Sequence, residues 1–278
     1  MPSHHVSTLA DLRAIYPPPP AGSLATRCVF QHLDRHHAAF IALSPFLTIA
    51  SADQHGVPDV SPRGDLAGFV AVLDAQTLLI PDRPGNRKLV TLSNILENPA
   101  IALVFFVPGR TESLRVNGRA RITTDPTLLA PLAAQGKNPA SGLVVAVDLA
   151  WLHCGRALIR SRLWDAESHA APDALPSLGQ MLADQIAGVE AAEAETRLAT
   201  ANGAAAVGRA NRTGGASVRI ADALEHDASS GRTSRSPAGL DGAALIAAGS
   251  RRIQSGRIFS DGTRRHSLAL PISPSAGT

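Results

Sequence analysis

The chain has 278 residues, a formal net charge of +3 at pH 7 and 45% hydrophobic residues, a length that fits one or two folded domains. Its longest uninterrupted apolar run, 100–107, has 8 residues, whereas a membrane-spanning helix needs about 20. The first twenty residues contain charged side chains instead of the apolar core of a signal peptide. Two cysteines are too few for a disulfide framework. These features argue against membrane-spanning and disulfide-stapled classes and predict a cytoplasmic protein.

The positive charge is unevenly distributed along the chain. Residues 1–196 hold 15 Lys/Arg and 18 Asp/Glu, whereas residues 197–278 hold 11 and 5. Leu, Ile, Val and Phe number only 14 in those last 82 residues, too few to offset the entropy of ordering the backbone. We therefore expect three parts: an N-terminal helix with a proline-rich lead-in (1–24), a folded domain (25–200) and a disordered basic tail (201–278). The overall basicity is then a property of the tail, and a nucleic-acid partner is not indicated.

Apolar residues at helical spacing predict a helix over 27–41, after the stiff Pro17–Pro20 segment. Further helices are expected at 87–97, 126–134, 152–163 and 178–199. Seven segments have the alternation or the apolar run of a strand: 46–51, 57–61, 68–73, 77–80, 100–107, 113–123 and 142–148. Tight turns join most of them, so the pattern predicts a mainly β (α+β) fold, an antiparallel barrel with appended helices.

The segment between the strand at 77–80 and the helix at 87–97 indicates an anion site. Asn86 is a favourable N-cap after the permissive Gly85, which would put Arg87 and Lys88 in the first helical turn. There the helix dipole disfavours each cation by about 0.3–1 kcal/mol. A bound anion such as phosphate would offset this cost, because it contacts both cations and the free backbone N–H groups. Arg83 adds a third cation. The alternative is that these side chains only solvate the helix.

A second motif lies where an expected strand ends in Pro62-Arg63-Gly64. An arginine beside a residue without a side chain suits a flat ligand that rests on the backbone while Arg63 donates to its polar edge. The alternative is an ordinary hairpin arginine. Asp65, which follows, and Glu112 are candidate acid or base groups.

Several motifs in order now indicate a family. They are Pro62-Arg63-Gly64, the run Leu79-Ile80-Pro81-Asp82-Arg83-Pro84-Gly85-Asn86-Arg87-Lys88, the segment from Leu92 to Pro99, and Leu114-Arg115-Val116-Asn117-Gly118-Arg119-Ala120. Together they resemble the pyridoxamine 5′-phosphate oxidase-like flavoproteins, the FMN-binding split-barrel superfamily. The resemblance covers about residues 25–200.

This resemblance implies a homodimer of six-stranded split barrels, with FMN in a cleft at each end of the interface. It implies that Arg63 approaches the isoalloxazine ring, that Pro81 and Asp82 line the ring and ribityl chain, and that Arg87 and Lys88 hold the phosphate. Ser113 falls where the oxidase has a glutamine that contacts the ring. Trp164 stands for the aromatic residue expected late in the fold.

The function that follows is an FMN-dependent oxidoreductase acting on an unidentified small molecule. No Trp-Arg pair occurs in the sequence, so the oxidase's C-terminal substrate elements, Trp-Arg and Arg-x-His, are not identified and vitamin B6 phosphate is not indicated as substrate. The alternatives are a deazaflavin-dependent reductase on the same fold and a flavin-binding regulatory module without turnover. No metal site is predicted, because His153-Cys154 and the pair His32/His36 lack a third ligand.

Overall fold

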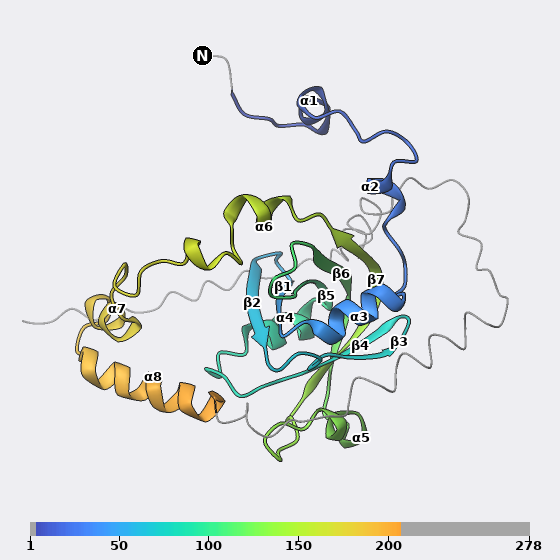
Figure 1. Ribbon diagram of the computed structural model, residues 1–278. Coiled ribbons are helices and arrows are strands. Elements are labelled where there is room, and N and C mark those ends of the chain that lie inside the picture. The colour runs from blue at the N-terminus through green and yellow to red at the C-terminus, as the bar shows by residue number, and fades with distance from the viewer. Residues whose placement is uncertain (1–3, 207–278) are drawn as a thin grey trace, which may run out of the picture.

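A computed structural model describes residues 4–206, and its centre is one seven-stranded antiparallel sheet in the order β2-β1-β5-β6-β7-β4-β3 (Figure 1). The strands are β1 (Phe46–Ala52), β2 (Pro58–Gly64), β3 (Ala71–Asp74), β4 (Thr77–Pro81), β5 (Ala100–Phe106), β6 (Ser113–Thr123) and β7 (Gly142–His153). The predicted antiparallel α+β class is confirmed, and all seven expected strands are present. The sheet has one strand more than the six that the resemblance implies. It is strongly curved but open, since β2 and β3 are its edges.

The register of the strands places a continuous apolar core on the inner face. Leu47 and Ile49 of β1, Leu103 and Phe105 of β5, and Leu114 and Val116 of β6 are all 0% exposed. Within each strand, the two buried residues are separated by one residue, as the alternation of side chains along a strand requires. The intervening residues of β1 and β5 are partly or fully exposed, so the outer face of these strands is less buried than the core face.

The helix expected at 27–41 is wrong in its first half. The structure has α1 (Leu9–Ile15), α2 (Leu24–Arg27) and α3 (Arg35–Leu43), and Phe30 instead forms an isolated bridge with Ala150 of β7. The Asp34 carboxylate accepts hydrogen bonds from the backbone N–H groups of His36 and His37, so α3 begins after Asp34. A capping residue in mid-pattern therefore overrides the apolar periodicity.

Two more expected helices have other limits. Strand β7 continues to His153 and takes the first residues of the helix expected at 152–163, leaving α6 (Arg156–Ser161). The helix expected at 178–199 is two helices, α7 (Leu178–Gln185) and α8 (Ala191–Ala206), because Gly188 between them has a φ of 79°, which no right-handed helix contains.

The remaining helices are α4 (Val90–Glu97), α5 (Pro126–Leu129) and the short 3₁₀ segments η1 (Ala130–Leu132) and η2 (Ala166–Ser168). Helices α7 and α8 pack against each other beside the barrel, and α1 stands away from it (Figure 1). Across residues 4–206, no helix combines the length and apolar character needed to cross a bilayer. The disordered tail expected from residue 201 lies outside the described residues from 207 onward, and residues 201–206 are the end of α8.

Candidate functional site

Four charged residues meet where β2 and β4 end. Arg83 Nε donates to Asp65 Oδ2 at 2.7 Å, and both side chains are about one-fifth exposed (19% and 18%). Four strands separate β2 from β4 in the sheet order, so this ion pair forms only because the sheet curls until its two sides approach each other. The contact joins the strand-end motif of Arg63 to the motif around Asp82.

The electrostatics of the cluster depend on Asp82, which is partly buried after the buried Pro81. Burial raises the pKa of the Asp82 carboxyl above its usual value, and the nearby Arg63 and Arg83 guanidinium groups lower it in part. Arg63 is itself held through Nη1, which donates to Ser61 Oγ and to the Pro62 carbonyl oxygen. The two cations and the two carboxyl groups of the cluster are balanced, so it is not a strongly positive site.

The start of α4 differs from the expectation. The helix begins at Val90 and not at Arg87, and its N-cap is Leu89 instead of Asn86. Arg87 and Leu89 have φ angles of 59° and 58°, and left-handed residues of this kind cannot be part of a right-handed helix. Asn86 instead accepts the backbone N–H of Lys88 on Oδ1 at 3.0 Å, a local turn inside the loop. The prediction that Arg87 and Lys88 lie in the first helical turn is therefore wrong.

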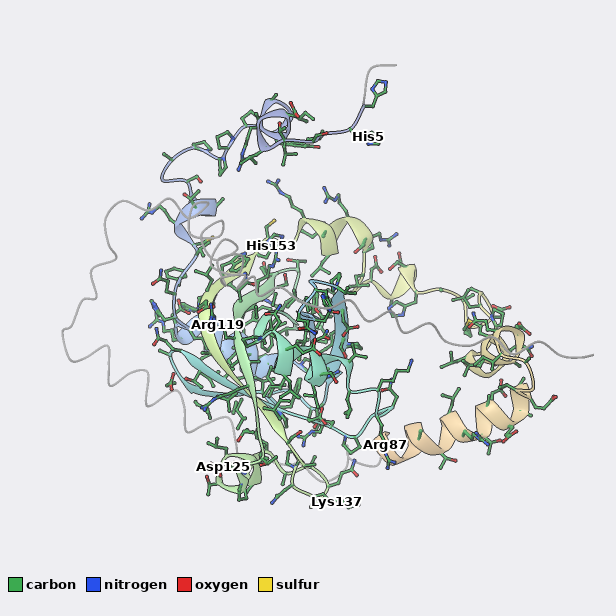
Figure 2. All side chains as sticks on the ribbon, turned by 180° about the vertical axis from the view of Figure 1, so that it is seen from behind. His5, Arg87, Arg119, Asp125, Lys137 and His153 are labelled. Atoms are coloured by element: carbon green, nitrogen blue, oxygen red, sulfur yellow. The ribbon has the colours of Figure 1, made fainter. Side chains whose placement is uncertain are left out.

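The loop nevertheless keeps the features of an anion site. Arg87 and Lys88 are exposed, and Figure 2 shows the Arg87 side chain in this loop at the periphery of the barrel. The helix that follows has no side-chain cap, so its first backbone N–H groups lack the partner that a capping residue supplies. Two cations directly before an uncapped helix start fit a phosphate group well.

Ser113 and Gly64 lie on the other face of the sheet. The strand register forms a row of directly opposed residues from Gly64 through Phe46, Phe106 and Ser113 to His153. Opposed residues share a face, and Arg63 is opposite Leu47, which points into the core. Ser113 therefore points outward whereas Arg63 points inward, about three strand spacings or ~14 Å apart along the sheet.

Trp164 lies close to the Ser113 end of β6. Its Nε1 donates to the Arg110 carbonyl oxygen at 2.8 Å, in the loop that joins β5 to β6. Gly155, before α6, packs so closely against Thr111 of the same loop that a Cβ atom would come within 2.6 Å of Thr111 Cβ. Trp164 is thus bonded near the start of the strand that Ser113 begins. Figure 2 shows His153, the cross-strand neighbour of Ser113, and Arg87 in different parts of the molecule.

The sequence-predicted site is therefore divided in two within one chain. The residues Arg63, Pro81, Asp82, Arg83, Asn86, Arg87 and Lys88 belong to one group; Gly64 and Ser113 lie on the outer face, and Trp164 is bonded to the loop before β6. No cluster of three or more His, Cys, Asp or Glu side chains suited to a metal ion occurs in residues 4–206. Sequence reasoning considered Asp65 as an acid or base, and it missed the ion pair with Arg83 because no local pattern reports a contact between distant strands.

Comparison with known proteins gives one family match. Residues 33–154 match the family model described as pyridoxamine 5′-phosphate oxidase. Comparison with curated protein sequences gives no match.

Similar solved structures include HupZ of Group A Streptococcus, which is 17% identical over 43% of this chain and 93% of HupZ, with a TM-score of 0.36. A putative pyridoxamine 5′-phosphate oxidase of Lactobacillus delbrueckii is 22% identical over 44% of this chain and 95% of its own, with a TM-score of 0.34. An FMN-binding protein of Syntrophomonas wolfei is 13% identical over 41% and 80%, with a TM-score of 0.32.

Proposed function

We propose that the protein is an FMN-dependent oxidoreductase that acts on a small molecule, a proposal supported by the match of residues 33–154 to the pyridoxamine 5′-phosphate oxidase family model. The observation that carries the proposal is the loop 82–89. It presents two exposed cations, Arg87 and Lys88, directly before a helix start without a side-chain cap. These groups supply what a phosphate dianion needs: positive charge and free backbone N–H donors.

The charged cluster at the ends of β2 and β4 is suited to the flavin ring. FMN, when bound, supplies the two-electron redox chemistry. Arg63 would stabilise negative charge that develops on the ring during reduction. Pro81 would give the ring an apolar wall and Asp82 a hydrogen-bonding carboxyl, whose position beside two guanidinium groups keeps the local charge near neutral.

A homodimer follows from the division of the site between two faces. Ser113 points away from the face that carries Arg63, and Trp164 is bonded to the loop before β6, so a second copy of the chain would bring both to the same flavin. The outer face of β1, β5 and β6 supports this arrangement, since Phe46 is 41% exposed there. Analytical ultracentrifugation of the full chain should give a dimer at micromolar concentration, and a monomer would contradict it.

Equilibrium titration of the full chain with flavins tests the proposed cofactor. We expect FMN to bind more tightly than riboflavin, because riboflavin has the same ring and ribityl chain but no phosphate for Arg87 and Lys88. A deazaflavin cofactor should be titrated alongside, since tighter binding of that compound than of FMN would identify a deazaflavin as the cofactor. If none of the three binds, the proposed function is wrong.

A further inference from the structure

The ion pair between Asp65 and Arg83 spans the open side of the barrel. Asp65 directly follows β2, an edge strand, and Arg83 lies two residues after the end of β4. Backbone hydrogen bonds hold β2 and β4 to other strands but not to each other. The 2.7 Å contact between Asp65 Oδ2 and Arg83 Nε therefore connects two parts of the sheet that its ladder leaves separate.

Asp65 is a fixed partner in this contact. Its backbone N–H donates to the Pro45 carbonyl oxygen at 3.1 Å, which ties it to the residue before β1. Its Oδ1 accepts the backbone N–H of Leu66 at 2.7 Å. The carboxylate is thus held by the backbone on one oxygen and presents the other to Arg83.

The loop that Arg83 begins has few other attachments to the barrel. The backbone N–H of Asp82 donates to the Ser141 carbonyl oxygen at 2.9 Å, and the Asn86–Lys88 hydrogen bond stays within the loop. Residues 84–89 are all exposed. Arg83 is therefore the last side chain with a described anchor to the barrel before the exposed cations.

We propose that Asp65 and Arg83 are positioning residues, whose ion pair is a clasp that fixes the 82–89 loop to the end of β2. This proposal rests on the proposed function. The clasp sets Asp82 beside Arg63 and presents Arg87 and Lys88 for the cofactor phosphate. Arg83 then acts through the loop, and it is not itself a phosphate ligand.

Four variants of the full chain test the clasp by flavin titration: Asp65→Asn, Arg83→Gln, the double variant, and Arg83→Lys. If the clasp positions the loop, each single variant weakens FMN by about tenfold and riboflavin by less, because riboflavin senses Asp82 and Arg63 but has no phosphate, and the double variant is no weaker than either. Arg83→Lys keeps the charge and should recover part of the loss. Asp59→Asn is the matched control, since it removes another partly buried carboxylate from β2 and should leave both affinities unchanged.

If Arg83 contacted the phosphate directly, Arg83→Gln would weaken FMN alone, and Asp65→Asn would have a smaller, additive effect. That outcome would overturn the proposal. The thermal midpoint of each variant without flavin shows whether a loss reflects unfolding instead.

Hydrogen exchange of the flavin-free chain separates failure of the clasp from failure of the proposed function. The Asp82 amide, which donates to the Ser141 carbonyl oxygen, and the Lys88 amide, which donates to Asn86, should exchange about tenfold faster in Asp65→Asn than in the parent chain, while those of β5 and β6 stay protected. Unchanged exchange in the loop overturns the clasp whether or not flavin binds. If the loop exchanges faster in Asp65→Asn but the parent chain binds no flavin, the clasp is supported as a structural feature and the proposed cofactor site is wrong.

Discussion

Replacing both loop cations, Arg87→Gln with Lys88→Gln, should weaken FMN binding and leave riboflavin binding unchanged. Two unit charges about 4 Å apart attract by about 1 kcal/mol in water and by about 4 kcal/mol at an effective dielectric constant of 20. Both side chains are exposed, so the lower part of this range applies, and each cation should contribute about tenfold in Kd. The double variant should therefore bind FMN about 100-fold more weakly, if the two contributions add.

Quenching of flavin fluorescence on titration measures both affinities, at low and at high salt. In the parent chain, Kd for FMN should rise with ionic strength, since exposed charges are screened, and the double variant should lose most of that dependence. Arg121→Gln, which removes an exposed cation from β6, is the control and should change neither ligand. Equal weakening of FMN and riboflavin, or no change in either, would refute the assignment of the phosphate to this loop.

Three other predictions follow from particular residues. Gly118→Ala should cost about 3 kcal/mol of unfolding free energy in a denaturant titration, because a Cβ atom there would lie 2.2 Å from the Ala146 carbonyl oxygen. Gly85→Ala is the control and should cost little, since its Cβ atom would meet nothing closer than 3.9 Å. Burial lowers the pKa of His37 below its ordinary value of 6.5, and the neighbouring Asp34 opposes the shift. As the pH falls below 6.5, the unfolded chain therefore takes up a proton on this histidine before the folded chain does, and the free energy of unfolding should fall. In His37→Gln this loss of stability should be smaller, as acid-dependent denaturant titrations would show. If each FMN site draws Lys88 from one copy and Trp164 from the other, mixing Lys88→Gln chains with Trp164→Ala chains should restore about a quarter of the sites. Half of the dimers are then mixed, and one of the two sites in each mixed dimer has both native residues. No recovery of FMN binding would show that each site belongs to one chain.

The residues around the candidate phosphate site could be identified from the sequence, but their conformation could not. The motif with Arg87 and Lys88 is local, and the apolar spacing of α4 is read correctly from Val90 onward. The start of that helix depends on Arg87 and Leu89 being left-handed, a conformation that non-glycine residues rarely adopt. No composition rule anticipates it.

Contacts between distant strands could not be predicted from the sequence, for a different reason. Alternation along each strand predicts the two faces, yet the register that aligns Gly64 with Phe46 and then Ser113 depends on the whole sheet. The separation of Ser113 from Arg63 follows from that register. The approach of Asp65 to Arg83 additionally requires the curvature of the sheet, so the ion pair is visible only in three dimensions.

Anaerobic reduction of the FMN-loaded chain tests the central claim most directly. The full-length protein is mixed with FMN, freed of excess by gel filtration, and treated with reduced nicotinamide under visible spectroscopy, with free FMN as the control. We expect one FMN to be retained per chain and its visible absorbance to bleach faster than that of free FMN, and to return on admission of oxygen or another acceptor. Loss of all FMN on the column would contradict the binding site, and retained FMN that reduced nicotinamide reduces no faster than free FMN would contradict the oxidoreductase.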